Sequence, residues 1–361
     1  MSNKIPVKNI DSKPSCEVKT VDLYASREKI YVKEIFGFFQ RIRTVSLWLL
    51  MGMYFVFCWV SINGEQLIYF DLPARKFHIF GATFWPQDFV LLSWLLIICA
   101  FGLFFITTLF GRIWCGYTCP QTVWTFIFMW VEEKVEGSRN QRIKMDKADH
   151  SRSKAFKKTT KHVIWLLISF ATGLTFVGYF YPIRELIFDF FTFNSVDEWV
   201  YFWVLFFTVA TYANAGWLRE QVCLYMCPYA RFQSVMFDKD TMIVSYNPNR
   251  GEPRGSRKKS IDPAKAGLGD CIDCDMCVQV CPTGIDIRDG LQYECIGCAL
   301  CIDACDQIMD KMNYPTGLIS YSNENSLEGK KAHLVRPKSI GYGIVLSLMI
   351  GAVIYSLASR V

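Results

Sequence analysis

Long uncharged stretches alternate with short, strongly charged segments along this chain. The uncharged stretches hold 18 to 22 residues each and run over 45–62, 89–110, 163–183, 199–218 and 340–359. A helix that crosses a bilayer needs about 20 largely apolar residues, so each stretch is long enough to span. The pattern predicts a mainly α-helical membrane protein with about five transmembrane helices.

Lysine and arginine follow a matching alternation. Segments 1–44, 132–161 and 219–339 hold nine, ten and fifteen of them, whereas 63–88 and 182–198 hold two and one. Because positive residues gather on the cytoplasmic side of a membrane, we expect the three basic segments in the cytoplasm. The formal net charge of +6 follows from this bias and suits membrane lipid as a partner. It gives no reason to expect nucleic acid.

A sixth apolar stretch, 113–131, follows the second predicted helix after only two residues. If it crossed the membrane, the basic segment 132–161 would lie outside, against the charge bias. We therefore expect an interfacial helix here, followed by a basic loop that lies against the membrane.

Eight of the 15 cysteines form two tandem runs between residues 271 and 305. Each run is spaced C-x2-C-x2-C-x3-C, the spacing with which bacterial ferredoxins hold [4Fe–4S] clusters, and the fourth cysteine of each run binds the other cluster. Disulfides are disfavoured in a reducing cytoplasm. We expect a cytoplasmic α+β ferredoxin domain with two clusters. Its ligands are Cys271, Cys274, Cys277 and Cys305 for cluster 1, and Cys295, Cys298, Cys301 and Cys281 for cluster 2.

The second run departs from the first at one position. Asp306 stands where the first run has Pro282. The carboxylate that this change adds could lower the potential of the nearby cluster, since net charge near a cluster is one of the terms that set its potential.

Four further cysteines belong to a duplicated motif, C-x-Y-x-C-P. The first copy holds Cys115 and Cys119, and the second holds Cys223 and Cys227. A residue before proline avoids the helical region, and proline suits the first position of a helix. We expect a helix break at the second cysteine of each copy, at a helix N-cap where the dipole favours thiolate.

Each copy of this motif follows two apolar helices, so the chain contains an internal repeat that could bring the copies together. Four soft thiolates would bind Cu(I), Zn(II) or a further iron–sulfur cluster, although free cysteines also serve as small buried hydrophobes. Beside the second copy, Arg219 and Glu220 could pair with each other. The four histidines offer no facing pair for a haem, and no glycine-rich nucleotide-binding motif is present.

These observations divide the chain into four parts. We expect a cytoplasmic arm over 1–44, a membrane domain with the duplicated unit over 45–240, a linker and ferredoxin domain over 241–337, and a last transmembrane helix over 338–361. Within the third part, 247–265 is rich in Pro, Gly and Arg and resembles a linker.

Four segments resemble the cytochrome c oxidase accessory protein family CcoG, also called FixG or RdxA. They are 114–124 (WCGYTCPQTVW), 216–231 (GWLREQVCLYMCPYAR), 251–255 (GEPRG) and 269–274 (GDCIDC). The resemblance implies a bacterial inner-membrane polyferredoxin that takes part in assembly of cbb3-type cytochrome oxidase. It also implies a cupric reductase in which Cys115, Cys119, Cys223 and Cys227 act on copper. Family members continue into an outer immunoglobulin-like domain, which we expect to be absent from this chain.

The leading expectation is therefore an enzyme, a metalloreductase that takes electrons from a cytoplasmic donor and works with copper chaperones or oxidase assembly factors. An alternative is a quinol-linked electron relay with an additional cluster at the four C-x3-C-P cysteines. A third is a non-enzymatic scaffold or copper chaperone. The sequence leaves open whether the chain forms a homo-oligomer.

Overall fold

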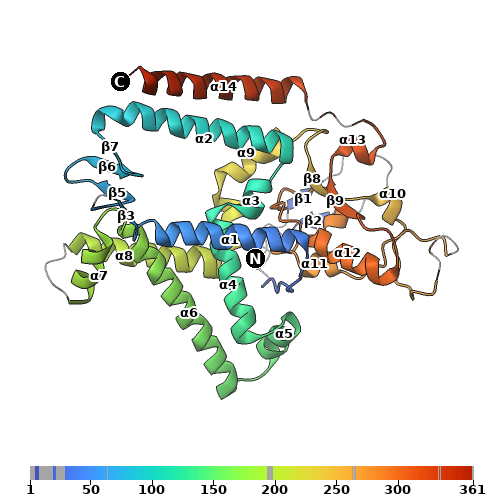
Figure 1. Cartoon of the computed structure of the whole chain (residues 1–361). Helices are drawn as coiled ribbons and strands as arrows, with labels where there is room; N and C mark the ends of the chain where they lie inside the picture. Colours follow the sequence, from blue (N-terminus) through green and yellow to red (C-terminus); the bar gives the residue numbers. More distant parts are fainter. Residues whose placement is uncertain are drawn as a thin grey trace.

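The computed structural model describes residues 5–7, 19–21, 29–62, 64–192, 198–261, 263, 266–331, 333 and 335–359. Half of the N-terminal arm predicted over 1–44 lies outside these residues. The described chain is mostly helical, with a membrane-type helical part and a smaller α+β unit beside it (Figure 1). A short strand pair near the start joins β1 (Ile5–Val7) to β2 (Lys19–Val21).

A helix forms most of each of the five long apolar stretches. Among the described residues, three are long and apolar enough to cross a membrane, over Pro86–Phe110, Arg152–Val177 and Pro337–Ala358. The helices in the first and fourth stretches are not among these three. The helix in the first stretch contains the polar residues Gln40, Arg41 and Arg43 near its start, and the helix in the fourth stretch is only 14 residues long. The five are α1 (Phe38–Val56), α2 (Phe89–Phe110), α6 (Arg152–Val177), α8 (Glu198–Thr211) and α14 (Pro337–Ala358).

The long helices pack side by side, with α14 along α2 and α8 along α6 (Figure 1). The start of α1, the end of α2 and the start of α14 all lie on the side of the α+β unit. At the opposite ends, a strand meander joins α1 to α2, and its longest pairing sets Ile68 opposite Ile79. Its strands are β3 (Ser61–Ile62), β4 (Glu65–Gln66), β5 (Ile68–Asp71), β6 (Lys76–Ile79) and β7 (Ala82–Phe84), followed by the 3₁₀ turn η1 (Pro86–Asp88).

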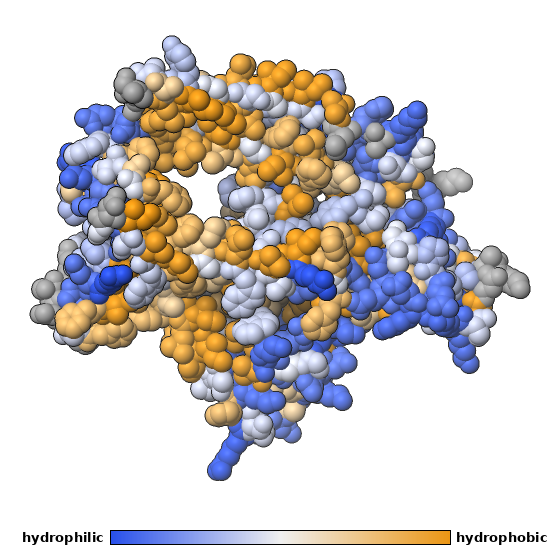
Figure 2. Space-filling view, in the orientation of Figure 1, coloured by the Kyte–Doolittle hydropathy of each residue, from blue (hydrophilic) through white to orange (hydrophobic). Residues whose placement is uncertain are grey.

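Apolar side chains cover the outside of the long helices. Figure 2 shows them over α14, α2 and α1, while hydrophilic residues cover the α+β unit and the lower end of α6. Exposed leucine, phenylalanine and tryptophan side chains are frequent on α2, where Leu96 is 62% exposed, and on α8, where Leu205 is 64% exposed. Such contiguous apolar surface is typical of a face that contacts lipid or another apolar partner.

The prediction of a basic loop over 132–161 is wrong, because most of this segment is helical. Helix α5 (Arg139–Lys147) lies within it, and α6 begins at Arg152 rather than near residue 163. The basic residues of α6 pair with acidic residues on the neighbouring helices α4 and α5. Lys161 lies 3.0 Å from Glu136, and Lys158 lies 2.7 Å from Asp146. This pairing removes the charge repulsion that would favour an extended loop.

The predicted interfacial helix over 113–131 is two helices. Helix α3 (Ile113–Tyr117) ends before Cys119, and α4 (Pro120–Glu136) begins at Pro120. The second half of the membrane part repeats this break. There α7 (Ile183–Thr192) and α8 lead into the π-helical turns η2 (Tyr212–Leu218) and η3 (Val222–Met226), and then into α9 (Pro228–Met236).

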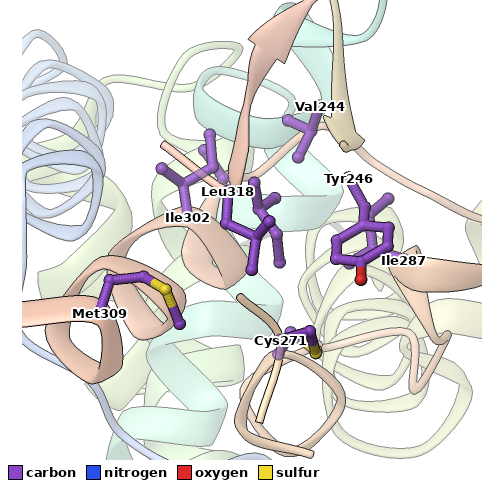
Figure 3. Close-up of a cluster of buried hydrophobic side chains, with 10 residues drawn as sticks. Val244, Tyr246, Cys271, Ile287, Ile302, Met309 and Leu318 are labelled. Carbon is purple, nitrogen blue, oxygen red and sulfur yellow. The ribbon is translucent and has the colours of Figure 1, made fainter. Parts of the chain in front are cut away.

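The α+β unit is built on two antiparallel strands that hold its ends together. β8 (Ile243–Tyr246) pairs with β9 (Ile319–Ser322), with Val244 opposite Tyr321. Its buried core includes Val244, Ile302 and Met309, with the ring of Tyr246 pointing toward Cys271 (Figure 3). The remaining elements are α10 (Pro248–Gly251), α11 (Met276–Gln279), η4 (Ile287–Asp289), α12 (Leu300–Met312) and α13 (Glu324–Leu327).

The segment predicted as a linker is partly integral to this unit, because β8 precedes it. Arg250 pairs with Asp270 at 2.5 Å, and Gly255 donates to the Cys271 carbonyl. Gly269 packs against the backbone of Gly251 so closely that a side chain at Gly269 would collide with it. These contacts hold 247–255 against the domain.

Candidate functional site

The eight ferredoxin cysteines form two groups, and each group draws one member from the other run. Burial raises the pKa of the Cys305 thiol to about 12, and the nearby thiols of Cys277, Cys271 and Cys274 add to this effect. In the same way, Cys281 of the first run acts on Cys295, Cys298 and Cys301 of the second. We call these groups the cluster-1 set (Cys271, Cys274, Cys277 and Cys305) and the cluster-2 set (Cys281, Cys295, Cys298 and Cys301).

The backbone of both runs turns in the same way. Asp273 and Asp275 flank Cys274 in the left-handed region, with φ of 53° and 55°, and Gly297 and Ala299 flank Cys298 with φ of 67° and 59°. Three of these four residues are not glycine, so the conformation carries strain of the kind that persists at functional sites. This geometry wraps three cysteines of each run around a common centre.

A cavity lies inside the cluster-2 set. Its lining includes all four cysteines of the set together with Cys277, and the rest of the lining is aliphatic except for Thr283. Soft thiolates in an apolar shell are the donor set that iron–sulfur clusters take. The residues present therefore fit a [4Fe–4S] cluster.

The first C-x-Y-x-C-P copy packs directly against the loop of the second ferredoxin run. A Cβ added to Gly116 would lie 2.8 Å from the Gly297 carbonyl oxygen and 3.0 Å from the Cys298 Cα. Only a glycine allows this approach, since both neighbours are backbone atoms. Cys115 and Phe126 also pack on the buried cluster that contains Ile35 and Cys298.

Arg112 ties this contact to the second half of the membrane part. Its side chain is 7% exposed. One guanidinium nitrogen donates to the carbonyls of Tyr293 and, at 3.3 Å, Cys295. The other donates to the Ala230 carbonyl on α9 at 2.6 Å. Arg112 thus links the second ferredoxin run to the helix that follows the second motif.

Both motifs break their helices where the sequence predicts. Cys119 and Cys227 are N-cap residues with ψ of 127° and 109°, and a proline begins the next helix in each case. Neither thiol makes a capping hydrogen bond. The second motif differs because its first four residues lie in a π-helical turn, η3, and such turns occur often at functional sites.

Arg219, for which the sequence suggests Glu220 as a partner, forms an ion pair with Glu132. The two side chains form a bidentate ion pair with N–O distances of 2.7 and 3.1 Å. Glu132 is almost fully buried and also receives Arg142 at 3.3 Å and Lys161 at 3.5 Å. Although burial opposes it, these cations hold the Glu132 pKa below its ordinary value. This ion pair therefore connects helix α4, which follows the first motif, to Arg219, which precedes the second motif.

The four motif thiols lie within electrostatic reach of one another. Burial raises the pKa of Cys115 to about 12, and Cys119, Cys223 and Cys227 add to the effect while Arg112 opposes it. Burial likewise raises the pKa of Cys223 to about 12, with Cys119 as the next cause. The repeat therefore brings both motifs together, as predicted. Within the described residues, no group of three His, Cys, Asp or Glu side chains is close enough to hold a single metal ion.

Sequence reasoning missed several residues of this site. Gln233 is fully buried and accepts a hydrogen bond from the Cys115 thiol at 3.3 Å. Arg112 and Glu132 flank the uncharged stretch 113–131. Charged residues at the two ends of an apolar stretch are a sequence signal by which both could have been identified. Gln233 follows the second motif by five positions and gives no comparable signal.

Comparison with known proteins agrees with this chemistry. A family model described as a 4Fe–4S dicluster domain matches residues 218–324, and one described as a 4Fe–4S binding domain matches residues 92–135. The first range contains the second motif and both ferredoxin runs. The second range contains the first motif. No solved structure is significantly similar.

Three curated relatives are similar over most of the chain. The nitrogen fixation protein FixG of Rhizobium meliloti is 43% identical over 83% of this chain and 58% of its own length. The proteins RdxB and RdxA of Cereibacter sphaeroides are 44% and 42% identical, over 85% and 83% of this chain and 65% and 63% of their own lengths. The chain thus spans between 58% and 65% of the length of these relatives.

Proposed function

Because the chain belongs to the family of FixG, RdxA and RdxB, we propose that it is a membrane-bound iron–sulfur protein that reduces Cu(II) to Cu(I) for assembly of a cbb3-type cytochrome oxidase. The cluster-1 and cluster-2 sets would each hold a [4Fe–4S] cluster. Cys115, Cys119, Cys223 and Cys227, which we call the four-thiol site, would take copper as substrate.

The contact between Gly116 and Cys298 is the observation that carries this proposal. It sets the first motif so close to the backbone of a cluster-2 cysteine that a Cβ added to Gly116 would lie 3.0 Å from the Cys298 Cα. A [4Fe–4S] cluster supplies electrons one at a time. One electron converts one Cu(II) to Cu(I), so the stoichiometry needs only a one-electron reductant in the cytoplasm. Soft thiolates favour the reduced ion, which adds to the driving force.

Topology and location are part of the same proposal. We propose five spans, with the ferredoxin domain and both motifs on the cytoplasmic side of a bacterial inner membrane. The exposed apolar side chains of the long helices and the alternation of the basic segments support this topology. The start of α1, the end of α2 and the start of α14 also lie beside the ferredoxin domain. The partners would be a cytoplasmic electron donor and copper chaperones or oxidase assembly factors.

The metal content of the purified protein tests the proposal. We expect about eight irons per chain both in the wild type and in a variant with all four motif cysteines changed to Ser, because two [4Fe–4S] clusters hold eight. Bound copper, and Cu(II) reduction by the dithionite-reduced protein, should be lost only in the variant. A variant that still reduces Cu(II) at the wild-type rate would contradict the proposal.

A second candidate is a quinol-linked relay with another cluster at the four-thiol site. One observation favours it, because the family model for a 4Fe–4S binding domain matches residues 92–135. The cysteines in that range are Cys99, Cys115 and Cys119. The same iron measurement separates the two candidates. More than eight irons in the wild type, falling to about eight in the four-serine variant, would select the relay.

A further inference from the structure

The two cysteine sets differ in the charges that surround them. Cluster 1 lies near carboxylates. Asp286 acts on Cys277, and Asp306 acts on Cys305. The cation Arg288 also acts on Cys277, but it is shared by Asp273, Asp275 and Asp286 at 2.6–2.7 Å. A second cation, Arg257, donates to the Cys271 carbonyl at 3.4 Å. The group as a whole carries excess negative charge.

Cluster 2 lies near two buried arginines. Arg43 is 3% exposed and Arg112 is 7% exposed. The guanidinium of Arg43 lies 4.0 Å from the ring centre of Phe126, and its Nη1 makes no hydrogen bond to any described residue. Its charge acts on the Cys298 thiol, and the charge of Arg112 acts on Cys295. Neither arginine belongs to the ferredoxin unit, since both come from the membrane part.

The carboxylate of Asp303 lies near Arg43 and offsets part of its charge. Asp303 of α12 accepts hydrogen bonds from the backbone of Gln40 at 2.7 Å and Phe39 at 3.2 Å, at the start of α1. This contact holds the start of α1 against α12, and Arg43, one turn further along α1, interacts with Cys298. Glu294 lies beside Tyr293, which a further cation, Arg231, also approaches. The net charge of these side chains around cluster 2 is therefore positive, because three arginines (Arg43, Arg112 and Arg231) face two carboxylates (Asp303 and Glu294).

We infer that Arg43, with Arg112, holds the potential of cluster 2 above that of cluster 1, so that electrons enter at cluster 1 and collect beside the four-thiol site. This inference rests on the proposed function, since it takes both cysteine sets to be occupied. Reduction adds negative charge to a cluster, and a nearby cation stabilises that charge. Arg43 touches no substrate and acts only through the cluster.

Burial by itself would lower the potential of cluster 2 relative to that of cluster 1. Cys274 of the cluster-1 set is exposed, whereas no cysteine of the cluster-2 set is, and a low dielectric disfavours the more negative reduced state. The same low dielectric strengthens the attraction to a buried cation several-fold compared with a charge at the surface. Two buried guanidinium groups therefore outweigh the desolvation, while the carboxylates around Cys274 are screened by water.

The exposed position of Cys274 gives this gradient its direction. A soluble donor can approach the cluster-1 set at that cysteine. The cluster-2 set is covered by the first motif, by Ile35 and by Phe126. Cluster 1 is thus the accessible end, and cluster 2 the end in contact with Gly116.

Potentiometric titration of the purified protein, followed by electron paramagnetic resonance, tests the inference without copper. Arg288→Gln removes a cation from cluster 1 and identifies its signal, which should be the one of lower potential in the wild type. Arg43→Gln should lower only the higher potential, changing that reduction equilibrium about tenfold, which corresponds to 59 mV for one electron. Arg43→Lys keeps the charge and should restore most of the wild-type value.

Two results would overturn the inference. In one, the Arg288→Gln signal is that of higher potential, a result that decides the matter even where Arg43→Gln fails to assemble its clusters. In the other, Arg43→Gln retains full iron and both potentials are unchanged. The four-serine variant should give wild-type potentials. Failure of the copper proposal therefore leaves this test intact.

Discussion

The two copies of the C-x-Y-x-C-P motif share a sequence pattern but not an environment. In the first copy, Tyr117 is 8% exposed and Gly116 contacts the backbone of the second ferredoxin run. In the second copy, Tyr225 is 64% exposed and Leu224 occupies the position of Gly116. The first copy ends an α-helical turn, and the second lies in a π-helical one.

This difference shows how a duplicated sequence can take two roles. The first copy is enclosed by the ferredoxin domain, so it suits the receipt of electrons. The second copy presents Tyr225 and Met226, which is 62% exposed, to the surroundings. It therefore suits the approach of a substrate ion or a partner. The first two predictions below each change one copy and use the other as its control, and the last two concern the helix that follows the first copy.

The largest effect should come from changing the second residue of the motif, which is Gly116 in the first copy and Leu224 in the second, to the residue that the other copy has. Gly116→Leu forces a side chain against the backbone of Gly297 and Cys298, which cannot yield, so the first motif should separate from the cluster-2 set. A misplacement of about 1 Å can slow a reaction about 100-fold, and we expect a loss of that size in Cu(II) reduction by the dithionite-reduced protein. Leu224→Gly should cost only the helix propensity of about 1 kcal/mol.

Equal losses in the two variants would show that both copies need the same packing, and would remove the asymmetry argued above. Iron content serves as the control. Gly116→Leu should retain both clusters, because Gly116 is not a ligand.

The two tyrosines should differ in their contribution to stability. Tyr117→Ala removes a buried ring between the membrane part and the ferredoxin domain, and truncations of buried aromatic residues cost about 3–5 kcal/mol. Tyr225→Ala changes an exposed residue and should stay within about 0.5 kcal/mol. Thermal unfolding in detergent, followed by circular dichroism, measures both. Similar losses in the two variants would contradict the burial difference.

Glu132 tests whether the two copies depend on a common clamp. Glu132→Gln leaves Arg219, Arg142 and Lys161 without their shared carboxylate, and breaking a buried ion pair costs about 3–5 kcal/mol. We expect the lower part of that range, because Lys161 keeps Glu136. The geometry before the second motif should loosen, so copper binding should weaken even though no cysteine is changed. Unchanged copper affinity in a destabilised variant would restrict Glu132 to a structural role.

Spacing and proline position made the helix breaks and the cysteine grouping predictable. The C-x2-C-x2-C-x3-C pattern indicated the exchange of the fourth cysteines, and the pattern of thiol neighbours agrees with it. Proline after Cys119 and Cys227 indicated both N-caps. These features are local, because a few residues determine the backbone whatever surrounds them.

The contacts between distant segments were not predictable. Nothing near Arg43 in the sequence points to Cys298, and nothing near Gly116 points to Gly297. The sequence suggests Glu220 as the partner of Arg219, whereas the fold brings Glu132 of α4 to Arg219. The charged segment over 132–161 was expected to be a loop for a similar reason, since its acidic partners only become evident once the helices pack.

The smallest effect concerns Glu133, the neighbour of Glu132 on α4. Burial and the nearby carboxylate of Glu34 raise its pKa to about 6. A carboxyl group whose pKa is higher in the folded state binds its proton more tightly there, so this group stabilises the protein at low pH. That stability is lost as the pH rises from about 4.5 through 6, by roughly 1 kcal/mol after allowance for solvent screening. Glu132, with a lowered pKa, has the opposite slope and loses its contribution in acid.

Glu133→Gln should therefore flatten the change in unfolding free energy between pH 4.5 and 7, and Glu34→Gln should do the same by lowering the pKa of Glu133. Glu132→Gln should leave that slope in place. Unfolding measured at several pH values separates the two residues. A slope that survives Glu133→Gln would place the titrating group elsewhere. A slope that disappears would show that adjacent residues of α4 face two environments, the clamp of the second motif and the segment that covers cluster 2.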